Sequence, residues 1–309
     1  TGGSPYLVHA AHAAEAIAAG RCDVALVTMA GRPRSEPAVS AFSSAGAFTP
    51  PDQPFELPYG PAAINTYAMC AMRHMHEFGT TPEQLAWIRV AASHHAQHNP
   101  HAVFRDLVTV EDVLASPVVA DPLHRLDCCM NTDGGGALVI VKPEIARSLA
   151  RPTVTLRGAG EFVKHQSGGR VDLTWSGARE SGRAAFAMAG VTPVDIAYAS
   201  VYDSFTITVL IQLEDLGFCE KGRGGAFVAD GNLIAGVGRM PVNTDGGGLC
   251  NSHPAGRGGM PKIVEAVRQL RGEAHPAVQV PGCALALVHG TGGSLGSRHG
   301  SATLILERS

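Results

Sequence analysis

A glycine-rich turn in the second half of the chain delivers a histidine that could do acid–base chemistry. Residues 243–256 read NTDGGGLCNSHPAG, with His253 directly before a proline. Such a histidine can act as a general base or polarise a carbonyl, and the glycines let a substrate approach the backbone closely. The alternative is a loop histidine that only caps a helix. The motif alone makes this segment a candidate site and leaves its role open.

Two other segments place polar side chains directly after apolar runs. Tyr202 follows IAYASV and begins the sequence YDSF. A phenol at the end of a buried strand could donate a proton to a developing oxyanion, or it could only anchor the strand. His289 lies in VHGTGGS, a turn that includes Gly292. This turn lacks the lysine of a P-loop, which argues against nucleoside triphosphate hydrolysis.

The sequence supports a metal site or a serine nucleophile less well than it supports an acid–base site. His94, His95, His98 and His101 have helical spacing and could hold zinc, but no cysteine or carboxylate completes a known zinc signature. We therefore predict solvated histidines at the end of a helix, and no metal site. The G-x-S-x-G motif of serine hydrolases does not occur.

Composition limits the partners and the location. The chain has 309 residues, 45% of them hydrophobic, which is enough for a large core. Its formal net charge of -3 is spread among interspersed acids and bases, which predicts neither a nucleic acid nor an anionic membrane as partner. The seven cysteines form no CxxC pair and predict reduced thiols. No apolar run reaches the ~20 residues of a membrane span and no signal peptide is evident, so a soluble, cytoplasmic protein is expected.

The elements that must position these residues alternate between helices and short apolar strands. Helices are expected over 7–19, 62–77, from Thr81 onward, 178–189 and 261–271, and strands over 23–29, 137–141, 152–158, 196–201, 284–290 and 302–307. A Pro- and Ser-rich stretch over 31–61 is expected to cover a site or a subunit contact. The alternation predicts an α/β layered fold in which both sheet faces are covered. The hexapeptide NTDGGG occurs at 131–136 and again at 243–248, which suggests two related halves.

Together these segments resemble the thiolase superfamily, most of all its sterol-carrier-type, lipid-transfer-protein branch. The most specific stretches are YDSFTITVLIQLEDLGFCEKGRGG at 202–225, then 241–256, then IVEAVRQLRGEA at 263–274. The resemblance implies a five-layer α-β-α-β-α sandwich of two similar halves, normally dimeric. The halves would be 1–150 and 151–309, with the first part of the N-terminal half missing from the chain.

Carried over by position, the resemblance implies an unusual site. The nucleophilic cysteine of thiolases falls on Gly3, where Ser4 is the only nucleophilic neighbour, and the second cysteine falls on His289. The histidine of the Gly-His-Pro motif matches His253, and the Asn or His of a third motif falls on Tyr202. Without the cysteine no acyl-enzyme forms by the thiolase route. The loss fits the group of steroid side-chain aldolases, which cleave β-hydroxyacyl-CoA by a retro-aldol reaction with tyrosines as acid–base residues. Tyr202 stands at a fitting place for such a tyrosine, whereas His253 departs from an all-tyrosine scheme.

The resemblance also implies the ligand and the partners. Coenzyme A (CoA) enters as part of the thioester substrate and no cofactor is bound permanently, with Ser176, Gly247 and Gly292 as the expected contacts. The expected partners are a second copy of the chain and a small protein with an OB fold and a zinc ribbon. Two alternatives remain: an acyltransferase that uses Cys250 as nucleophile, and a non-catalytic acyl-CoA carrier or scaffold subunit.

Overall fold

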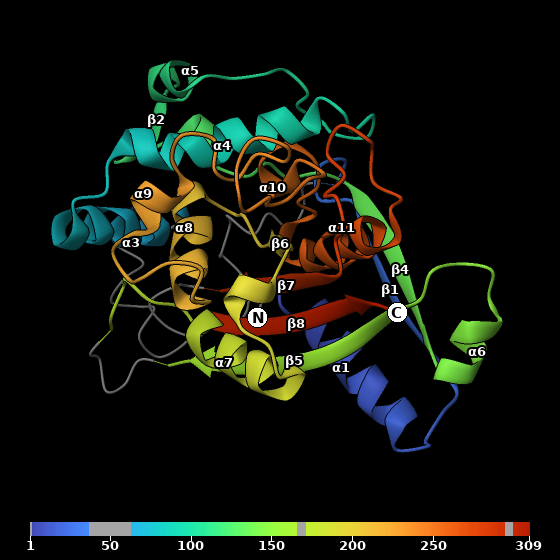
Figure 1. The fold of residues 1–309 in the computed structure, drawn as a ribbon. Coiled ribbons are helices and arrows are strands. Elements are labelled where there is room, and N and C mark those ends of the chain that lie inside the picture. Colours follow the sequence, from blue (N-terminus) through green and yellow to red (C-terminus); the bar gives the residue numbers. More distant parts are fainter. Residues whose placement is uncertain (1, 37–62, 166–170, 294–298) are drawn as a thin grey trace.

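The computed structural model describes residues 2–36, 63–165, 171–293 and 299–309. Figure 1 shows the arrangement of these residues in layers of helices and strands. Most of the Pro- and Ser-rich stretch expected to cover a site lies outside the described residues.

The larger sheet has four strands and carries one side of the candidate site. Its order is β5 (Val154–Lys164), β8 (His299–Arg308), β7 (Leu285–Gly292) and β6 (Tyr198–Val201). β6 runs parallel to β7, whereas β5–β8 and β7–β8 are antiparallel. Because Val201 pairs with His289, the chain leaves β6 beside the glycine-rich end of β7. Two of the predicted functional segments therefore meet at one edge of this sheet.

The smaller sheet pairs β1 (Val24–Gly31) with β4 (Gly134–Val141) in antiparallel register. Helices α1 (Pro5–Ala18) and α11 (Gly259–Arg271) contact strands of both sheets and so lie between them (Figure 1). Leu7 and Ile263 from these helices join a core cluster with strand residues of the larger sheet, and Leu138 of β4 packs against that cluster. The central layer is therefore helical and apolar on both sides.

Helices α7 (Ala178–Ala189) and α8 (Thr206–Asp215) form the next layer, beyond the larger sheet. Two glycines of β5 let α7 approach closely: a Cβ atom at Gly158 would lie 2.2 Å from the carbonyl oxygen of Ala185. The described residues thus form a sheet, a helical layer, a second sheet and a second helical layer. This arrangement confirms the predicted α/β layered class.

The remaining elements surround the layers. They are α3 (Ala63–Phe78), α4 (Pro82–Ala96), α5 (Val110–Ala115), β2 (Val118–Ala120), β3 (Leu123–His124), α6 (Pro143–Ser148), α9 (Gly224–Val228), α10 (Gly247–Cys250) and the 3-10 turns Arg125–Asp127, Pro193–Asp195 and Ala255–Arg257. The predicted start of α4 is confirmed, because Thr81 and Gln84 cap each other's backbone N–H groups. The predicted end of α7 is confirmed too, with Gly190 in the left-handed conformation.

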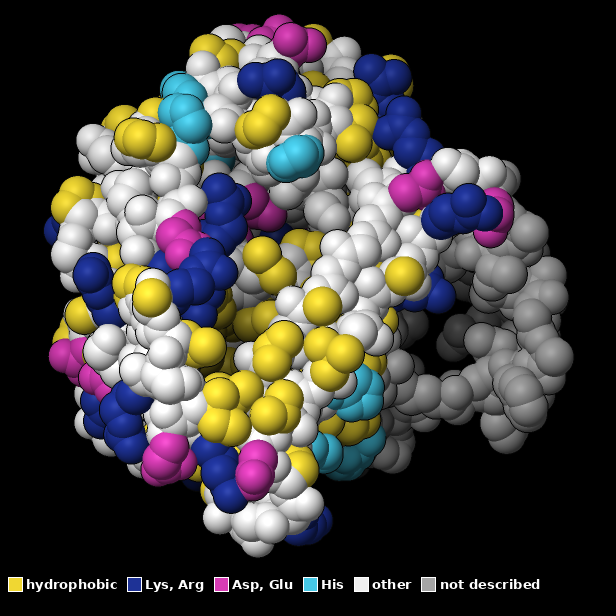
Figure 2. Space-filling model, turned by 90° about the vertical axis from the view of Figure 1, so that its right-hand side faces the viewer, with side chains coloured by type: hydrophobic (Ala, Val, Ile, Leu, Met, Phe, Trp, Pro, Cys, Tyr) yellow, Lys and Arg dark blue, Asp and Glu magenta, His cyan; other side chains and the backbone are white. Residues whose placement is uncertain are grey.

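Two expectations differ from the structure. The outer face of the β1–β4 pair is open within the described residues, with Leu26 64% and Val139 66% exposed. Figure 2 shows hydrophobic side chains gathered on the side of the molecule that carries these strands. His95 is buried rather than solvated, and its Nε2 accepts a hydrogen bond from the N–H of Ala235 at 2.9 Å. Among the described helices none is both long and apolar enough to cross a membrane.

Candidate active site

Tyr202 and His253 meet at the end of β6. The Tyr202 hydroxyl oxygen lies 2.8 Å from Nε2 of His253 and 3.2 Å from the carbonyl oxygen of Ala255. Both side chains are buried, with 4% and 8% of their surface exposed. Two residues 51 positions apart in the sequence therefore form one buried hydrogen-bonded pair; the acid–base role that the motifs suggested for each stays a prediction.

The second copy of the NTDGGG repeat fixes this pair to the sheet. Asn243 adopts φ 55°, which asparagine tolerates better than most residues. Its side-chain oxygen accepts from the N–H of Val201 at 2.9 Å, and its amide donates to the Val201 carbonyl at 2.9 Å. The side chain therefore acts like an added strand residue, and it holds the turn against the last residue of β6.

The first copy of the repeat holds His253 from the other half of the chain. The Thr132 hydroxyl accepts from the N–H of His253 at 2.9 Å, and the N–H of Thr132 donates to the His253 carbonyl at 3.2 Å. The repeat was noted in the sequence as a sign of two related halves. In the structure its first copy contacts the histidine that follows its second copy.

His289 reaches the pair through its backbone. Its carbonyl accepts from the N–H of Tyr202 at 3.0 Å, while its ring Nδ1 lies 2.9 Å from the hydroxyl of Thr303 on β8. Its Nε2 has no hydrogen-bond partner among the described residues, although the whole residue is buried. The structure thus brings the three predicted catalytic residues together at one sheet end, where Nε2 of His289 and Nδ1 of His253 are both buried without a hydrogen-bond partner among the described residues.

Burial decides the protonation states of these residues. Burial, with the nearby charge of Lys262, lowers the pKa of His253 to about 4, and burial lowers the pKa of His289 to about 3. Burial also raises the pKa of Tyr202 well above its usual value. At neutral pH the site therefore holds two uncharged imidazoles and a protonated phenol, since burial disfavours every charged form.

Gly3 packs directly on the ring of Tyr202. A Cβ atom at Gly3 would lie 2.0 Å from Cε2 of Tyr202, so no side chain fits at this position, which was predicted to replace the nucleophile of thiolases. The N–H of Gly3 donates to the carbonyl of Thr291 at 2.9 Å, which ties it to the end of β7. Ser4, the neighbouring hydroxyl, is buried at the start of α1.

Sequence reasoning missed a buried ion pair behind Tyr202. Asp203 and Lys262 lie 2.5 Å apart, and each side chain is 1% exposed. Asp203 also accepts from the N–H groups of Gly248 and Leu249 at 2.8 and 3.2 Å. A lysine at a position of α11 that points to the core was a signal in the sequence, because lysine is rarely buried without a partner.

The residues predicted to contact CoA lie in different surroundings. Ser176 is fully buried, and its hydroxyl donates to Asp215 at 2.9 Å. Gly247 starts α10, where a Cβ atom would lie 2.1 Å from Oδ2 of Asp203. Gly292 ends β7 and touches Gly2. Their contact with CoA stays a prediction.

Cys250, the alternative nucleophile, is fully buried in α10. Burial raises the pKa of its thiol to about 12, so the thiol is protonated at neutral pH. A nucleophilic cysteine reacts as the thiolate and needs access to its substrate. These surroundings are those of a small core residue.

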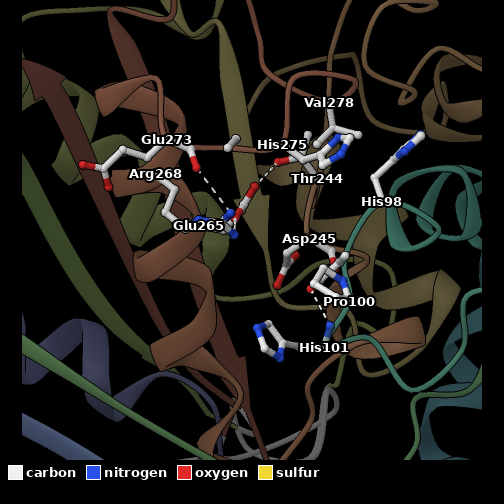
Figure 3. Close-up of a pocket in the computed structure, with 12 residues that line it drawn as sticks. His98, Pro100, His101, Thr244, Asp245, Glu265, Arg268, Glu273, His275 and Val278 are labelled. Atoms are coloured by element: carbon white, nitrogen blue, oxygen red, sulfur yellow. Dashed lines mark hydrogen bonds and ion pairs between the residues drawn. The ribbon is translucent and has the colours of Figure 1, made fainter.

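A separate cavity of about 440 Å³ opens beside the loop that precedes α10 (Figure 3). Its lining includes Asp245, His98 and His275, and the two imidazole rings stack at 5.0 Å. At its wall the buried Glu265 has a pKa raised to about 7 by burial and by Asp245. None of the predicted site residues lines this cavity, and no group in the described part of the chain has the makeup of a metal site.

Comparison with known proteins places this geometry in a family. Residues 160–308 match the family described as Thiolase C-terminal domain-like. The chain is 42% identical to a steroid side-chain-cleaving aldolase of Thermomonospora curvata over 70% of this chain and 56% of that protein. It is 38% identical to the 17-hydroxy-3-oxo-4-pregnene-20-carboxyl-CoA lyase of Mycobacterium tuberculosis over 88% of this chain and 72% of that protein. An acetyl-CoA acetyltransferase of Methanothermobacter thermautotrophicus is 40% identical over 81% of this chain and 65% of its own length.

A solved structure agrees with these relatives. The Ltp2-ChsH2(DUF35) aldolase superposes with a TM-score of 0.85 at 34% identity, over 99% of this chain and 78% of that chain. The chain spans 65% and 56% of the lengths of the acetyltransferase and the Thermomonospora aldolase. By its sequence and its fold, the chain belongs to the thiolase-like superfamily, in the sterol-carrier-type branch.

Proposed function

We propose that the protein cleaves a carbon–carbon bond in a β-hydroxyacyl-CoA thioester by a retro-aldol reaction. The observation that carries the proposal is the contact between the Tyr202 hydroxyl and Nε2 of His253, at 2.8 Å, directly over Gly3. An acid–base pair occupies the position next to which a thiolase would hold its nucleophile. Similarity to a steroid side-chain-cleaving aldolase and to a pregnene-carboxyl-CoA lyase supports the same reaction class.

The pair supplies a base without a charged residue. The β-hydroxyl of the substrate gives its proton to the Tyr202 oxygen while the phenol passes its own proton to Nε2 of His253. The bond between Cα and Cβ then breaks, which releases a ketone or an aldehyde and leaves the enolate of the shorter acyl-CoA. The same relay, run backwards, returns the proton to Cα of the enolate. The neutral state of His253 supports this role, because only a neutral imidazole can accept the proton.

His289 is the proposed partner of the thioester oxygen. Its Nε2 is buried and without a hydrogen bond to the described residues. The other ring nitrogen is held by Thr303 at 2.9 Å, which orients the ring. A preoriented donor in a dry site stabilises a developing enolate oxygen strongly. In this scheme Gly247, Gly292 and Ser176 are the proposed contacts of CoA, and CoA enters and leaves as part of the thioester.

The proposed substrate class is a CoA thioester with a β-hydroxyl and a bulky, steroid-side-chain-like acyl group. The names of the similar lyase and aldolase support this class. The similar aldolase complex contains a DUF35 protein, which supports a partner of the OB-fold and zinc-ribbon type. We further propose a homodimer, two halves over 1–150 and 151–309, and a cytoplasmic location.

The test is a product assay with β-hydroxyacyl-CoA and β-ketoacyl-CoA thioesters, with and without a DUF35 partner, followed by mass spectrometry. The expected result is a ketone or aldehyde plus a shorter acyl-CoA, formed without free CoA and lost in Tyr202→Phe. Cleavage of β-ketoacyl-CoA alone, and only with free CoA, would overturn the proposal in favour of an acyltransferase. Tight binding of acyl-CoA without any product would overturn it in favour of a carrier.

The acyltransferase reading has one observation in its favour, the 40% identity to an acetyl-CoA acetyltransferase. An acyltransferase of this kind needs a nucleophile, and neither candidate position supplies one. Gly3 has no side chain, and the thiol of Cys250 is buried and protonated. The retro-aldol reaction needs neither group, so it is the better supported function.

A further inference from the structure

The buried ion pair between Asp203 and Lys262 connects the elements that carry the acid–base pair. Asp203 is the residue after Tyr202, so its position in the chain is tied to the phenol. Lys262 lies on α11, and the two charged atoms are 2.5 Å apart. Each side chain is 1% exposed, so water cannot replace either partner. The pair therefore links the end of β6 to the central helix.

The same carboxylate also holds the loop that leads to His253. Its Oδ1 accepts from the N–H of Gly248 at 2.8 Å, and its Oδ2 accepts from the N–H of Leu249 at 3.2 Å. The fit is tight: a Cβ atom at Gly247 would lie 2.1 Å from Oδ2 of Asp203, and one at Gly248 would lie 3.3 Å from Cδ2 of His253. Any movement of the carboxylate would therefore move the loop and, with it, the imidazole.

We propose that Asp203 and Lys262 are positioning residues that set the contact between the Tyr202 hydroxyl and the His253 ring. The carboxylate fixes the backbone on both sides of this contact, and the ammonium group keeps the carboxylate in place. Neither residue touches Tyr202 Oη or His253 Nε2 in the described hydrogen bonds, so their role is indirect. The consequence for turnover rests on the proposed retro-aldol function, whereas the contact itself does not.

The charges around the histidine agree with this role. Lys262 is the charged group that lowers the pKa of His253 besides burial, and the phenol of Tyr202 is its neutral neighbour. Around Asp203, burial raises the pKa of the carboxyl, while Lys262 and the N–H of Gly248 oppose that rise. Asp245 adds a further rise. Lys262 thus favours a charged Asp203 and a neutral His253, the state that the relay requires.

The test compares Lys262→Met, the double variant Asp203→Asn/Lys262→Met and a matched control. The control is Glu214→Gln, since Glu214 is also a buried carboxylate that accepts from two backbone N–H groups, at Gly222 and Gly224, forms an ion pair with Lys221 and contacts His74. The double variant removes both charges together, which avoids a lone buried charge if the single variant does not fold.

The first readout needs no substrate. NMR titration of 15N-labelled histidine rings, assigned with His253→Gln, measures the pKa of His253 directly. We expect it to rise by about one pH unit in Lys262→Met and in the double variant, because a nearby positive charge is lost. We expect no change in Glu214→Gln. An unchanged His253 titration in both Lys262 variants, or an equal rise in the control, would overturn the inference.

The second readout is turnover. We expect kcat to fall by about 100-fold with little change in KM, because misplaced reacting groups slow the chemical step more than binding. The acid limb of the pH profile should move upward together with the pKa of His253. If the wild-type protein showed no retro-aldol turnover, the proposed function would fail while the NMR result would still decide the inference. A loss of binding alone, with kcat preserved, would contradict the positioning role.

Discussion

A Cβ atom on Gly3 would lie 2.0 Å from Cε2 of Tyr202, well inside contact distance. The ring of Tyr202 can therefore hold its present position only because residue 3 has no side chain. In this chain the ring of Tyr202 occupies the space beside the start of α1, and its hydroxyl forms a hydrogen bond with His253. A nucleophile at residue 3 and the present position of Tyr202 exclude each other.

Replacing Gly3 by alanine or cysteine should displace the Tyr202 ring and abolish turnover. The added atom forces a shift of neighbouring groups, for which we expect a loss of about 1–3 kcal/mol in the free energy of unfolding. Gly3→Cys should gain no acyltransferase activity. Denaturant unfolding and product assays measure both effects. Gly256→Ala is the control, because its Cβ would meet no atom closer than 3.5 Å; equal losses in the two variants would contradict the steric account.

Removing the Tyr202 hydroxyl should stop the reaction with little loss of structure. Tyr202→Phe removes the bond to Nε2 of His253 at 2.8 Å and the bond to the Ala255 carbonyl at 3.2 Å. We expect kcat to fall by about 100- to 10,000-fold, the usual range for an acid–base group. Steady-state kinetics measure the loss, and circular dichroism checks the fold. A variant that kept more than a tenth of the wild-type rate would exclude Tyr202 from the proton relay.

The buried histidines should make the protein less stable in acid. His289 has a pKa of about 3 in the folded state, below the ~6.5 of an unfolded chain. Between these values the unfolded state binds the proton and the folded state does not, so the free energy of unfolding rises with pH in this window. The contribution is fully present above pH ~6.5 and falls by about 1.4 kcal/mol per pH unit as the pH drops below it.

The comparison of wild-type protein with His289→Gln isolates this contribution. Urea unfolding at several pH values between about 4.5 and 7 gives the slope for each protein. The variant should have a smaller slope over this window, whatever its stability at pH 7. Parallel curves would show that His289 is protonated in the folded protein.

Cys250 should be dispensable for turnover. Its thiol is fully buried and its pKa is raised to about 12. Cys250→Ala is therefore expected to keep the wild-type rate within a factor of about three, with a loss of stability from the smaller side chain. Mass spectrometry of the intact protein after mixing with substrate should find no covalent acyl group. An acyl adduct on Cys250 would contradict this prediction and support the acyltransferase hypothesis.

Much of the secondary structure could be predicted from local sequence. α4 begins at Pro82, as the N-cap residue Thr81 and the proline at the first helical position predicted, and α7 ends at Gly190, as predicted. These signals could be read from the sequence because a helix end is fixed by the residues next to it. Helix α8 was not predicted as a helix. Its residues from Thr206 to Asp215 are all buried, so it lacks the polar face that reveals an amphipathic helix. The burial of His95 was missed for a related reason. The spacing of the histidines along one helix does not show which face of that helix is covered by another segment, here the one that contains Ala235.

By itself, the sequence determined the residue types of the site and their family. Tyr202, His253 and His289 could be proposed from their motifs, because motifs are properties of short segments, and the family resemblance allowed Gly3 to be proposed as the position of the replaced nucleophile. Only the tertiary structure decided which groups meet. The Tyr202–His253 contact, the hold of Thr132 on the His253 backbone and the Asp203–Lys262 pair join residues far apart in the chain. Protonation states were likewise decided by the fold, because burial by distant segments, and not the neighbouring residues, keeps the imidazoles uncharged.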